Sequence, residues 1–251
     1  MTSSDIHKSQ IRYARLAGLM FLFVDAAFLA SVLITTRFEV SGNFAETAHR
    51  IMGSELLYRI GLSSGLIASL CTVFLAMGLY VAVKPIDNNL ALLALVFRLV
   101  EATLFGVQVI VNFVVLKLYL GVDSVKAFDA NQLSVVVNLH LAAHSAVFTI
   151  ATIFFSIGSI LFFYLLFKST YIPKLLSGVG VFGSVLIPIV CFGSLMAPQH
   201  AKMLQLGWAP IGLGEILVGL WLLFKGVNLQ PQDIGNAAGG WPAQSSIPPT
   251  S

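Results

Sequence analysis

The stretch FRLVEATLFGVQVIVN, residues 97–112, decides the fold because it combines an apolar background with four strongly polar side chains. It lies inside an apolar run long enough to cross a membrane, for which a helix needs about 20 residues. At 100° per residue, Arg98, Glu101, Gln108 and Asn112 all fall within an arc of about 80°. This pattern predicts a membrane helix whose single polar stripe faces the inside of a bundle.

The composition extends this prediction to the whole chain. Of its 251 residues, 57% are hydrophobic and only 10% are charged, whereas soluble domains carry about 25% charged residues. The net charge of +3 is small and scattered, which excludes nucleic acid as a partner. Cys71 and Cys191 both lie in apolar segments, so we interpret them as core residues rather than a disulfide or a metal pair.

Six apolar segments are long enough to span a bilayer, and together they predict an all-α, polytopic six-helix membrane domain over residues 14–229. The first segment carries Asp25 at its centre and shows no signal-peptide cleavage site, so we expect it to remain as a membrane helix. The predicted helices are 14–36, 56–83, 88–117, 142–167, 172–196 and 209–226.

Lysine and arginine near the helix ends predict that both termini are cytoplasmic. Residues 1–13 form a polar N-terminus, and the Gly-, Pro- and Ser-rich residues 230–251 predict a disordered tail. The connections 37–55 and 118–141 are each long enough for a short surface helix. For residues 118–141, the alternative is an outward extension of the fourth membrane helix.

Three acidic residues remain inside predicted helices, namely Asp25, Glu101 and Glu215, and all three lie near the middle of their segments. At about 1.5 Å per residue, they fall within about 4 Å of one level. Arg98 lies about one turn to the cytoplasmic side of this level. Three acids therefore face one nearby basic residue. Further polar candidates in the outer half are Arg59, Gln108, Asn112 and His144.

Charged groups inside a membrane are costly, so these residues are expected to find partners. The sequence leaves several partners open: protons on the acids, Arg59 or a histidine reaching inward, or a bound cation such as a metal ion or a substrate amine. A further alternative is that Arg98 and Glu101 only pair with one another and fix helix packing.

Other motifs carry less information. The HLAAH motif, His140 to His144, has the spacing of two metal ligands on one helical face. It lacks the glutamate of a metalloprotease motif, and we favour His144 as a hydrogen-bonding member of the polar cluster. The sequence contains neither the G-x-S-x-G nucleophile elbow of hydrolases nor a phosphate-binding loop. We therefore predict no metal and no cofactor.

Several stretches resemble a family of bacterial integral membrane proteins, the domain of unknown function DUF4386. The resemblance spans about residues 12–229, and its departures include Thr170, where we expect glycine. Asp25 lies outside the matching pieces. These pieces are RLAGL (15–19), LYRIG (57–61), FRLVEA (97–102), FDANQL (128–133), His144, FKSTYIPKLL (167–176) and GEILVGLWLLFKGVN (214–228).

The resemblance implies a multi-pass protein of the bacterial inner membrane and no established chemistry. From the residues, the leading hypothesis is a carrier or sensor that binds a small molecule or cation in a buried polar cavity. One alternative is an accessory subunit with a membrane-protein partner, in which the polar cluster only fixes packing. The other is an enzyme that acts on a lipid or isoprenoid, with His144 and Glu215 as acid–base residues; we favour a non-enzymatic role.

Overall fold

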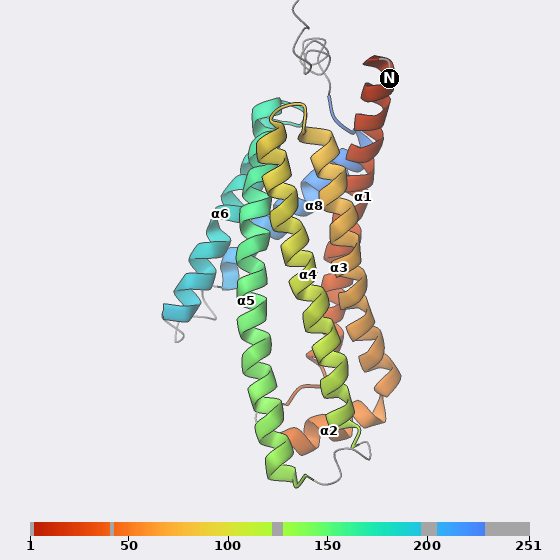
Figure 1. Cartoon of the computed structure of the whole chain (residues 1–251), viewed down its shortest axis with the longest axis vertical. Coiled ribbons are helices and arrows are strands. Elements are labelled where there is room, and N and C mark those ends of the chain that lie inside the picture. Colours follow the sequence, from red (N-terminus) through yellow and green to blue (C-terminus); the bar gives the residue numbers. More distant parts are fainter. Residues whose placement is uncertain (1–2, 41–42, 122–127, 197–204, 229–251) are drawn as a thin grey trace, which may run out of the picture.

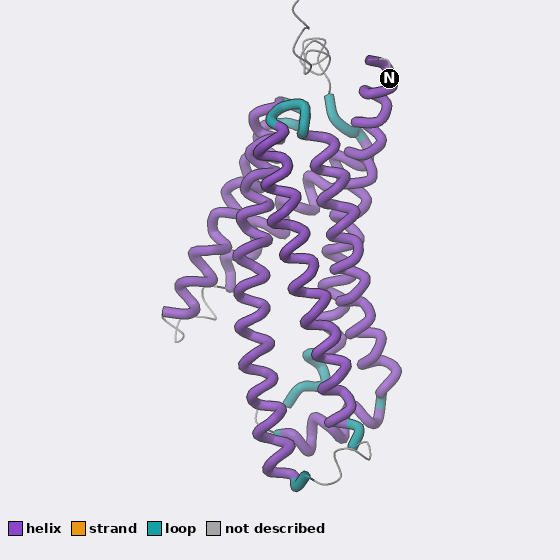
Figure 2. Tube along the Cα trace, in the orientation of Figure 1, coloured by secondary structure: helices purple, strands orange, loops and turns teal. Residues whose placement is uncertain are grey.

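The computed structural model describes residues 3–40, 43–121, 128–196 and 205–228, and these ranges contain helices but no strand (Figures 1 and 2). Six of the helices are long and apolar enough to cross a membrane. These are α1 (Ser3–Thr35), α3 (Glu55–Val83), α4 (Asn88–Tyr119), α5 (Ala130–Ser169), α6 (Lys174–Met196) and α8 (Ala209–Phe224). The predicted all-α membrane bundle is confirmed.

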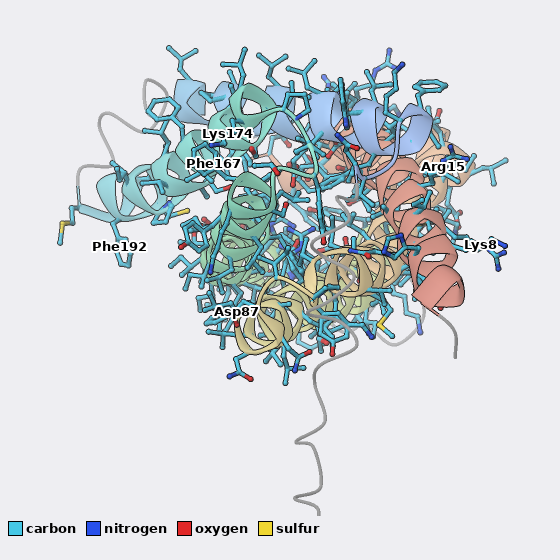
Figure 3. The ribbon with its side chains drawn as sticks, turned by 90° about the horizontal axis from the view of Figure 1, so that it is seen from above. Lys8, Arg15, Asp87, Phe167, Lys174 and Phe192 are labelled. Atoms are coloured by element: carbon cyan, nitrogen blue, oxygen red, sulfur yellow. The ribbon has the colours of Figure 1, made fainter. Side chains whose placement is uncertain are left out.

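The six long helices run alternately up and down and form a closed ring (Figures 1 and 3). Each contacts the next along the chain, and α8 returns to contact α1. We call the end at which α1 begins the N-terminal end; Lys8, Arg15 and Lys174 lie around it in Figure 3. The opposite end carries the short helix α2 (Phe44–Gly53), so we call it the α2 end.

Side chains encoded in the sequence cap several of these helices. The Asp87 carboxylate accepts a hydrogen bond from the Leu90 amide at 3.0 Å and starts α4. Asp129 and Gln132 form a reciprocal capping box that starts α5. At its other end α5 stops at Thr170, whose φ of 58° is in the left-handed region that favours glycine. This conformation accounts for the expectation of glycine at position 170.

Of the two structures that the sequence allows for residues 118–141, the chain adopts the extended helix. α5 begins at Ala130, well before the predicted start at residue 142. Its 40 residues correspond to about 60 Å at 1.5 Å per residue, about twice the thickness of a bilayer's hydrocarbon core. The bundle is therefore longer toward the α2 end than membrane crossing alone requires.

α2 is the surface helix expected in the other long connection, residues 37–55. The Asn43 side chain accepts a hydrogen bond from the Glu46 amide and caps it, and Glu46 pairs with Arg50 at 2.8 Å on the solvent side. Its other face buries Ile51 in an apolar cluster that also contains Tyr119. α2 therefore closes the α2 end of the bundle over α3, α4 and α5.

A small polar network ties segments from distant parts of the sequence together at the N-terminal end. The buried Gln10 side chain donates hydrogen bonds to the Ala82 carbonyl at 2.6 Å and to the Tyr171 hydroxyl at 3.2 Å. The Asn228 amide donates to the Tyr171 carbonyl at 3.0 Å. These bonds link α1, the end of α3, the α5–α6 turn and the residues that follow α8.

The two predicted terminal segments have different outcomes. Residues 3–13, expected as a polar terminus, form the first turns of α1. The prediction of a disordered tail over residues 230–251 lies outside the described residues.

Candidate functional site

The opening stretch lies on α4, where three of the four members of its polar stripe are buried. Arg98, Glu101 and Gln108 are 2%, 4% and 8% exposed, and Asn112 is half-buried. Arg98 Nη1 lies 3.1 Å from Glu101 Oε2, which is one helical turn away. The guanidinium also donates a hydrogen bond from Nη1 to the Ser159 hydroxyl on α5 at 3.2 Å.

Two further acids join this pair because α1 and α8 pack very closely. A Cβ atom at Gly18 of α1 would lie 2.6 Å from the Gly219 carbonyl oxygen of α8, so these two backbones are in direct contact. The helices run in opposite directions (Figure 1), and Asp25 and Glu215 therefore lie on the same side of this contact. Their carboxyl groups are close enough to interact with one another, and both interact electrostatically with Arg98.

We call Asp25, Arg98, Glu101 and Glu215 the core cluster. Its members come from α1, α4 and α8, and Glu215 also interacts electrostatically with Glu101. Glu215 is 8% exposed and Asp25 is half-buried. The cluster thus contains three carboxyl groups and one guanidinium in the apolar interior of the bundle.

α5 supplies the wall against which Arg98 packs. The guanidinium carbon lies 4.8 Å from the centre of the Phe155 ring, within the range of a cation–π contact. A Cβ atom at Gly158 would come within 2.9 Å of Arg98 Cδ, so glycine leaves the space that the side chain occupies. Phe155, Gly158 and Ser159 lie on adjacent turns of α5 and fix the position of the guanidinium.

Several polar atoms of the core cluster are not satisfied. Arg98 Nε, Glu101 Oε2 and Asp25 Oδ2 are buried and have no hydrogen-bond partner among the described residues. The 3.1 Å contact between Arg98 and Glu101 is therefore a charge contact rather than a hydrogen bond. A buried unsatisfied polar atom costs about 1–3 kcal/mol, so the cluster can be stabilised by an added partner.

The core cluster lies about ten residues along its helices from the N-terminal end of the bundle. Arg98 is about ten residues from Asn88, where α4 begins, and Glu215 is about ten residues from Lys225, just beyond α8. Each spacing corresponds to about 15 Å, which is half the thickness of a hydrocarbon core. Asp25 is at a similar distance from Arg15 on α1.

The structure does not bring the remaining predicted residues to the core cluster. Arg59 pairs with Glu55 of its own helix at 2.6 Å, on the exposed side of α3. His144 lies on α5 about 22 Å along the helix from Ser159, toward the α2 end. The Gln108 side chain donates a hydrogen bond to the His144 carbonyl at 3.1 Å. Gln108, Asn112 and His144 therefore belong to the half of the bundle nearest α2.

Sequence reasoning missed the contribution of α5 to the site. Phe155, Gly158 and Ser159 belong to the run FFSIGS within an otherwise apolar segment, and small residues of this kind often serve only for helix packing. Gly158 and Ser159 are small or polar residues within a membrane helix. Their presence was the signal that could have indicated a contribution of α5 to the site. Nothing in the sequence relates them to Arg98, which is about 60 residues earlier in the chain.

Metal coordination is not favoured by this geometry. Within the described ranges, no three His, Cys, Asp or Glu side chains are arranged so that they could hold a metal ion. The core cluster includes a guanidinium, which opposes a divalent cation beside it.

The model of the domain of unknown function DUF4386 matches residues 16–226, which is most of the chain. The chain belongs to the DUF4386 family. All four members of the core cluster lie within the matched residues. Comparison of this DUF4386 protein with curated proteins and with solved structures gives no match.

Proposed function

We propose that this DUF4386 protein binds a small monovalent cation, in the first place a proton, at the core cluster, as a carrier or a sensor. The observation that carries the proposal is the meeting of three carboxyl groups from three helices around one guanidinium. Uncompensated charge is costly inside a membrane, so such a cluster is stable only when cations balance the acids.

The closeness of the Asp25 and Glu215 carboxyl groups supports the proton as the first ligand. Two ionised carboxylates repel one another and can only accept hydrogen bonds, so a proton on one of them would let Asp25 and Glu215 share a hydrogen bond. With this proton and the Arg98 guanidinium, the cluster still carries one negative charge. One more proton or monovalent cation would neutralise it.

The position of the core cluster supports a role in exchange between the two sides of the membrane. Binding sites of many transporters lie near the bilayer midplane, between helices that rock against one another. Here the acids come from α1, α4 and α8, so a change in the charge of the cluster alters the forces between three helices. A carrier would use that change to move the cation, and a sensor would use it to change its shape.

We also propose that the N-terminal end faces the cytoplasm. Basic residues gather at this end, and such residues prefer the cytoplasmic side of a membrane (Figure 3). The bacterial inner membrane, implied by the family resemblance, is the proposed location. The basic residues in question are Lys8, Arg12, Arg15, Lys84, Lys168, Lys174 and Lys225.

One observation favours a second candidate function, that of an accessory subunit in which the core cluster only specifies packing. Arg98 fits closely against Gly158 and Phe155, as a purely structural residue would. In that case, replacement of Arg98 would lower the amount of folded protein, and a partner protein would co-purify with the chain.

Thermal unfolding of the protein in lipid nanodiscs distinguishes these roles. The melting temperature would be measured against pH and against sodium, potassium and a series of alkylamines, for wild type, Glu215→Gln and Glu101→Gln. The matched control is Glu55→Gln, because Glu55 is an exposed acid on α3 outside the core cluster.

We expect at least one cation or pH change to shift the melting temperature of wild type and of Glu55→Gln, but not that of Glu215→Gln. A shift of equal size in wild type and in both core-cluster variants would contradict the proposal. Loss of folded Arg98→Met protein together with recovery of a stoichiometric partner would favour the accessory subunit instead.

A further inference from the structure

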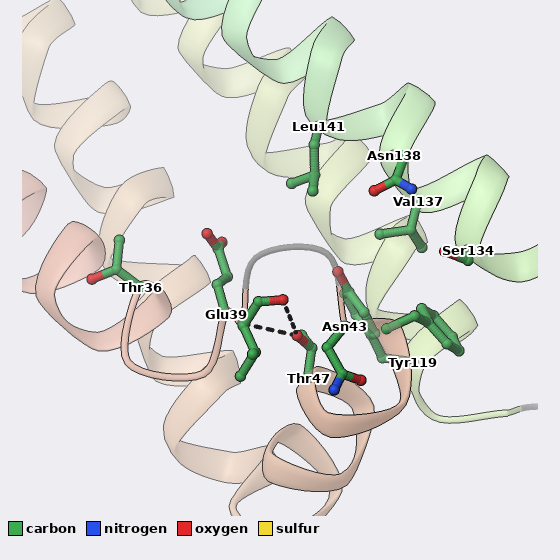
Figure 4. Close-up of a pocket in the computed structure, with 11 residues that line it drawn as sticks. Thr36, Glu39, Asn43, Thr47, Tyr119, Ser134, Val137, Asn138 and Leu141 are labelled. Atoms are coloured by element: carbon green, nitrogen blue, oxygen red, sulfur yellow. Dashed lines mark hydrogen bonds between the residues drawn. The ribbon is translucent and has the colours of Figure 1, made fainter. Parts of the chain in front are cut away.

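A second site lies at the α2 end, remote from the core cluster. A cavity of about 260 Å³ opens there between the end of α1, the start of α2, the end of α4 and the first turns of α5 (Figure 4). A water molecule occupies about 30 Å³ of the liquid, so the cavity has room for a small organic molecule. Its polar lining residues are Thr36, Glu39, Asn43, Thr47, Tyr119, Ser134 and Asn138.

The α1–α2 connection is held in place beside the cavity by local hydrogen bonds. The Val40 amide donates to the Thr47 hydroxyl at 2.9 Å (Figure 4). The Asn43 amide donates to the Val40 carbonyl at 3.0 Å. Asn43 in turn caps α2. Glu39 precedes Val40, so these bonds fix the backbone that carries its carboxylate.

Glu39 is the acidic member of the described lining, and that lining contains no basic side chain. It makes no ion pair or hydrogen bond with any residue that the structure describes. The Glu39 side chain as a whole is exposed, but the protein atoms around its carboxyl group displace part of its water, and this partial desolvation raises its pKa. The carboxylate is thus a charge that the surrounding protein leaves without a counter-charge.

Aromatic rings form another part of the wall. Phe44 and Tyr119 both line the cavity, and their rings are stacked with centres 5.4 Å apart. Figure 4 shows Glu39 on the side of α1 and Tyr119 on the side of α4 and α5. Aromatic faces attract cations, and the attraction is strongest for organic ammonium groups that shed water easily.

We propose that this cavity binds a small organic ammonium ion, with its cationic group near Glu39 and the Phe44–Tyr119 pair. The amide and hydroxyl groups of Asn138 and Ser134 provide hydrogen bonds for the polar remainder of the ligand. A small inorganic cation would not use the aromatic wall, and an anion would be repelled by Glu39. This inference is independent of the function proposed for the core cluster.

The ammonium group has two sources near a membrane surface: a free amine in solution, or the headgroup of a lipid such as phosphatidylethanolamine. The chemistry at Glu39 is the same for both. The lipid composition of the nanodisc separates them, because a headgroup competes with a soluble ammonium probe only when that lipid is present.

Isothermal titration calorimetry with choline chloride tests the proposal on full-length protein in phosphatidylglycerol nanodiscs. The uncharged isostere 3,3-dimethylbutan-1-ol tests the need for positive charge, and calcium chloride tests the preference for an organic cation. Variants would be Glu39→Gln, which removes the charge, and Asn138→Phe, which fills the cavity from the exposed side of α5. The matched control is Glu46→Gln, because Glu46 is an acid of α2 that does not line the cavity.

We expect choline to bind to wild type and to Glu46→Gln, with at least tenfold weaker binding to Glu39→Gln and to Asn138→Phe. The isostere should bind at least tenfold more weakly than choline. A loss of choline affinity as phosphatidylethanolamine is added would identify the lipid headgroup as the occupant, and an unchanged affinity would identify a free amine. Equal binding of choline and its isostere, tighter binding of calcium, or undiminished binding to folded Glu39→Gln would overturn the proposal.

Discussion

The close contact between α1 and α8 is what brings Asp25 and Glu215 together, and substitution of Gly18 by alanine tests it. The added Cβ would lie 2.4 Å from the Leu223 amide nitrogen and 2.6 Å from the Gly219 carbonyl oxygen. Ordinary contact begins at about 3.4 Å, so the helices must move apart by about 1 Å. Because both atoms belong to backbone, no side-chain rotation can relieve the overlap.

Gly212→Ala is the matched control, since a Cβ atom there meets nothing within 4 Å. Both substitutions gain the same helix propensity, about 1 kcal/mol, so the difference between them reports the overlap. Overpacking of this kind costs about 1–3 kcal/mol. A melting temperature changes by about 2–4 °C per kcal/mol in chains of this size, and we therefore expect Gly18→Ala to melt several degrees below Gly212→Ala.

The assay is thermal unfolding of both variants in the same nanodiscs, followed by circular dichroism. The amount of monodisperse protein recovered at a low temperature provides a second measure. If Gly18→Ala melted at the same temperature as Gly212→Ala or above it, the close approach of α1 and α8 would be wrong, and with it the meeting of their acids.

Three further predictions follow from individual residues. Thr170→Gly should raise the melting temperature by a few degrees, because a non-glycine residue in the left-handed region costs about 1–2 kcal/mol. In a double-mutant cycle, Arg98→Met should cost about 3–5 kcal/mol, and adding Glu101→Gln should recover part of the loss, whereas additive losses would argue against their pairing. Glu39→Gln should leave stability unchanged at acid pH, where the carboxyl is protonated in the folded and unfolded chains. It should stabilise the protein progressively as the pH rises toward the raised pKa of Glu39, because ionisation then costs the folded state of wild type; a constant difference between the melting curves across pH would contradict this.

Most of the fold could be predicted because membrane crossing is largely a matter of apolar length. The polar stripe on α4 was visible at helical spacing, and its buried members are those expected. The extension of α5 back to Ala130 was left as one of two alternatives, because Asn131, Gln132, Asn138 and His140 interrupt the apolar pattern of its first turns. Asp129 and Gln132 have the spacing of a capping box, and this signal would have located the true start.

The candidate site was predictable only in part. Depth along each helix was enough to put Asp25, Glu101 and Glu215 at one level. Depth along a helix does not specify the direction in which a side chain points from the helix axis. The local pairing of Arg59 with Glu55 was therefore not foreseen. The cavity beside Glu39 could not be predicted, since its walls come from a connection, a short helix and the ends of two long helices.

We propose above that the core cluster holds an exchangeable proton between Asp25 and Glu215. Infrared difference spectroscopy of the protein in nanodiscs, recorded as the pH is raised, tests this most directly. We predict a protonated-carboxyl band that disappears from wild type with rising pH and is absent from the same difference spectrum of Asp25→Asn and of Glu215→Gln, while Glu55→Gln retains it. A wild-type spectrum without such a band, or an identical band in all variants, would contradict the account.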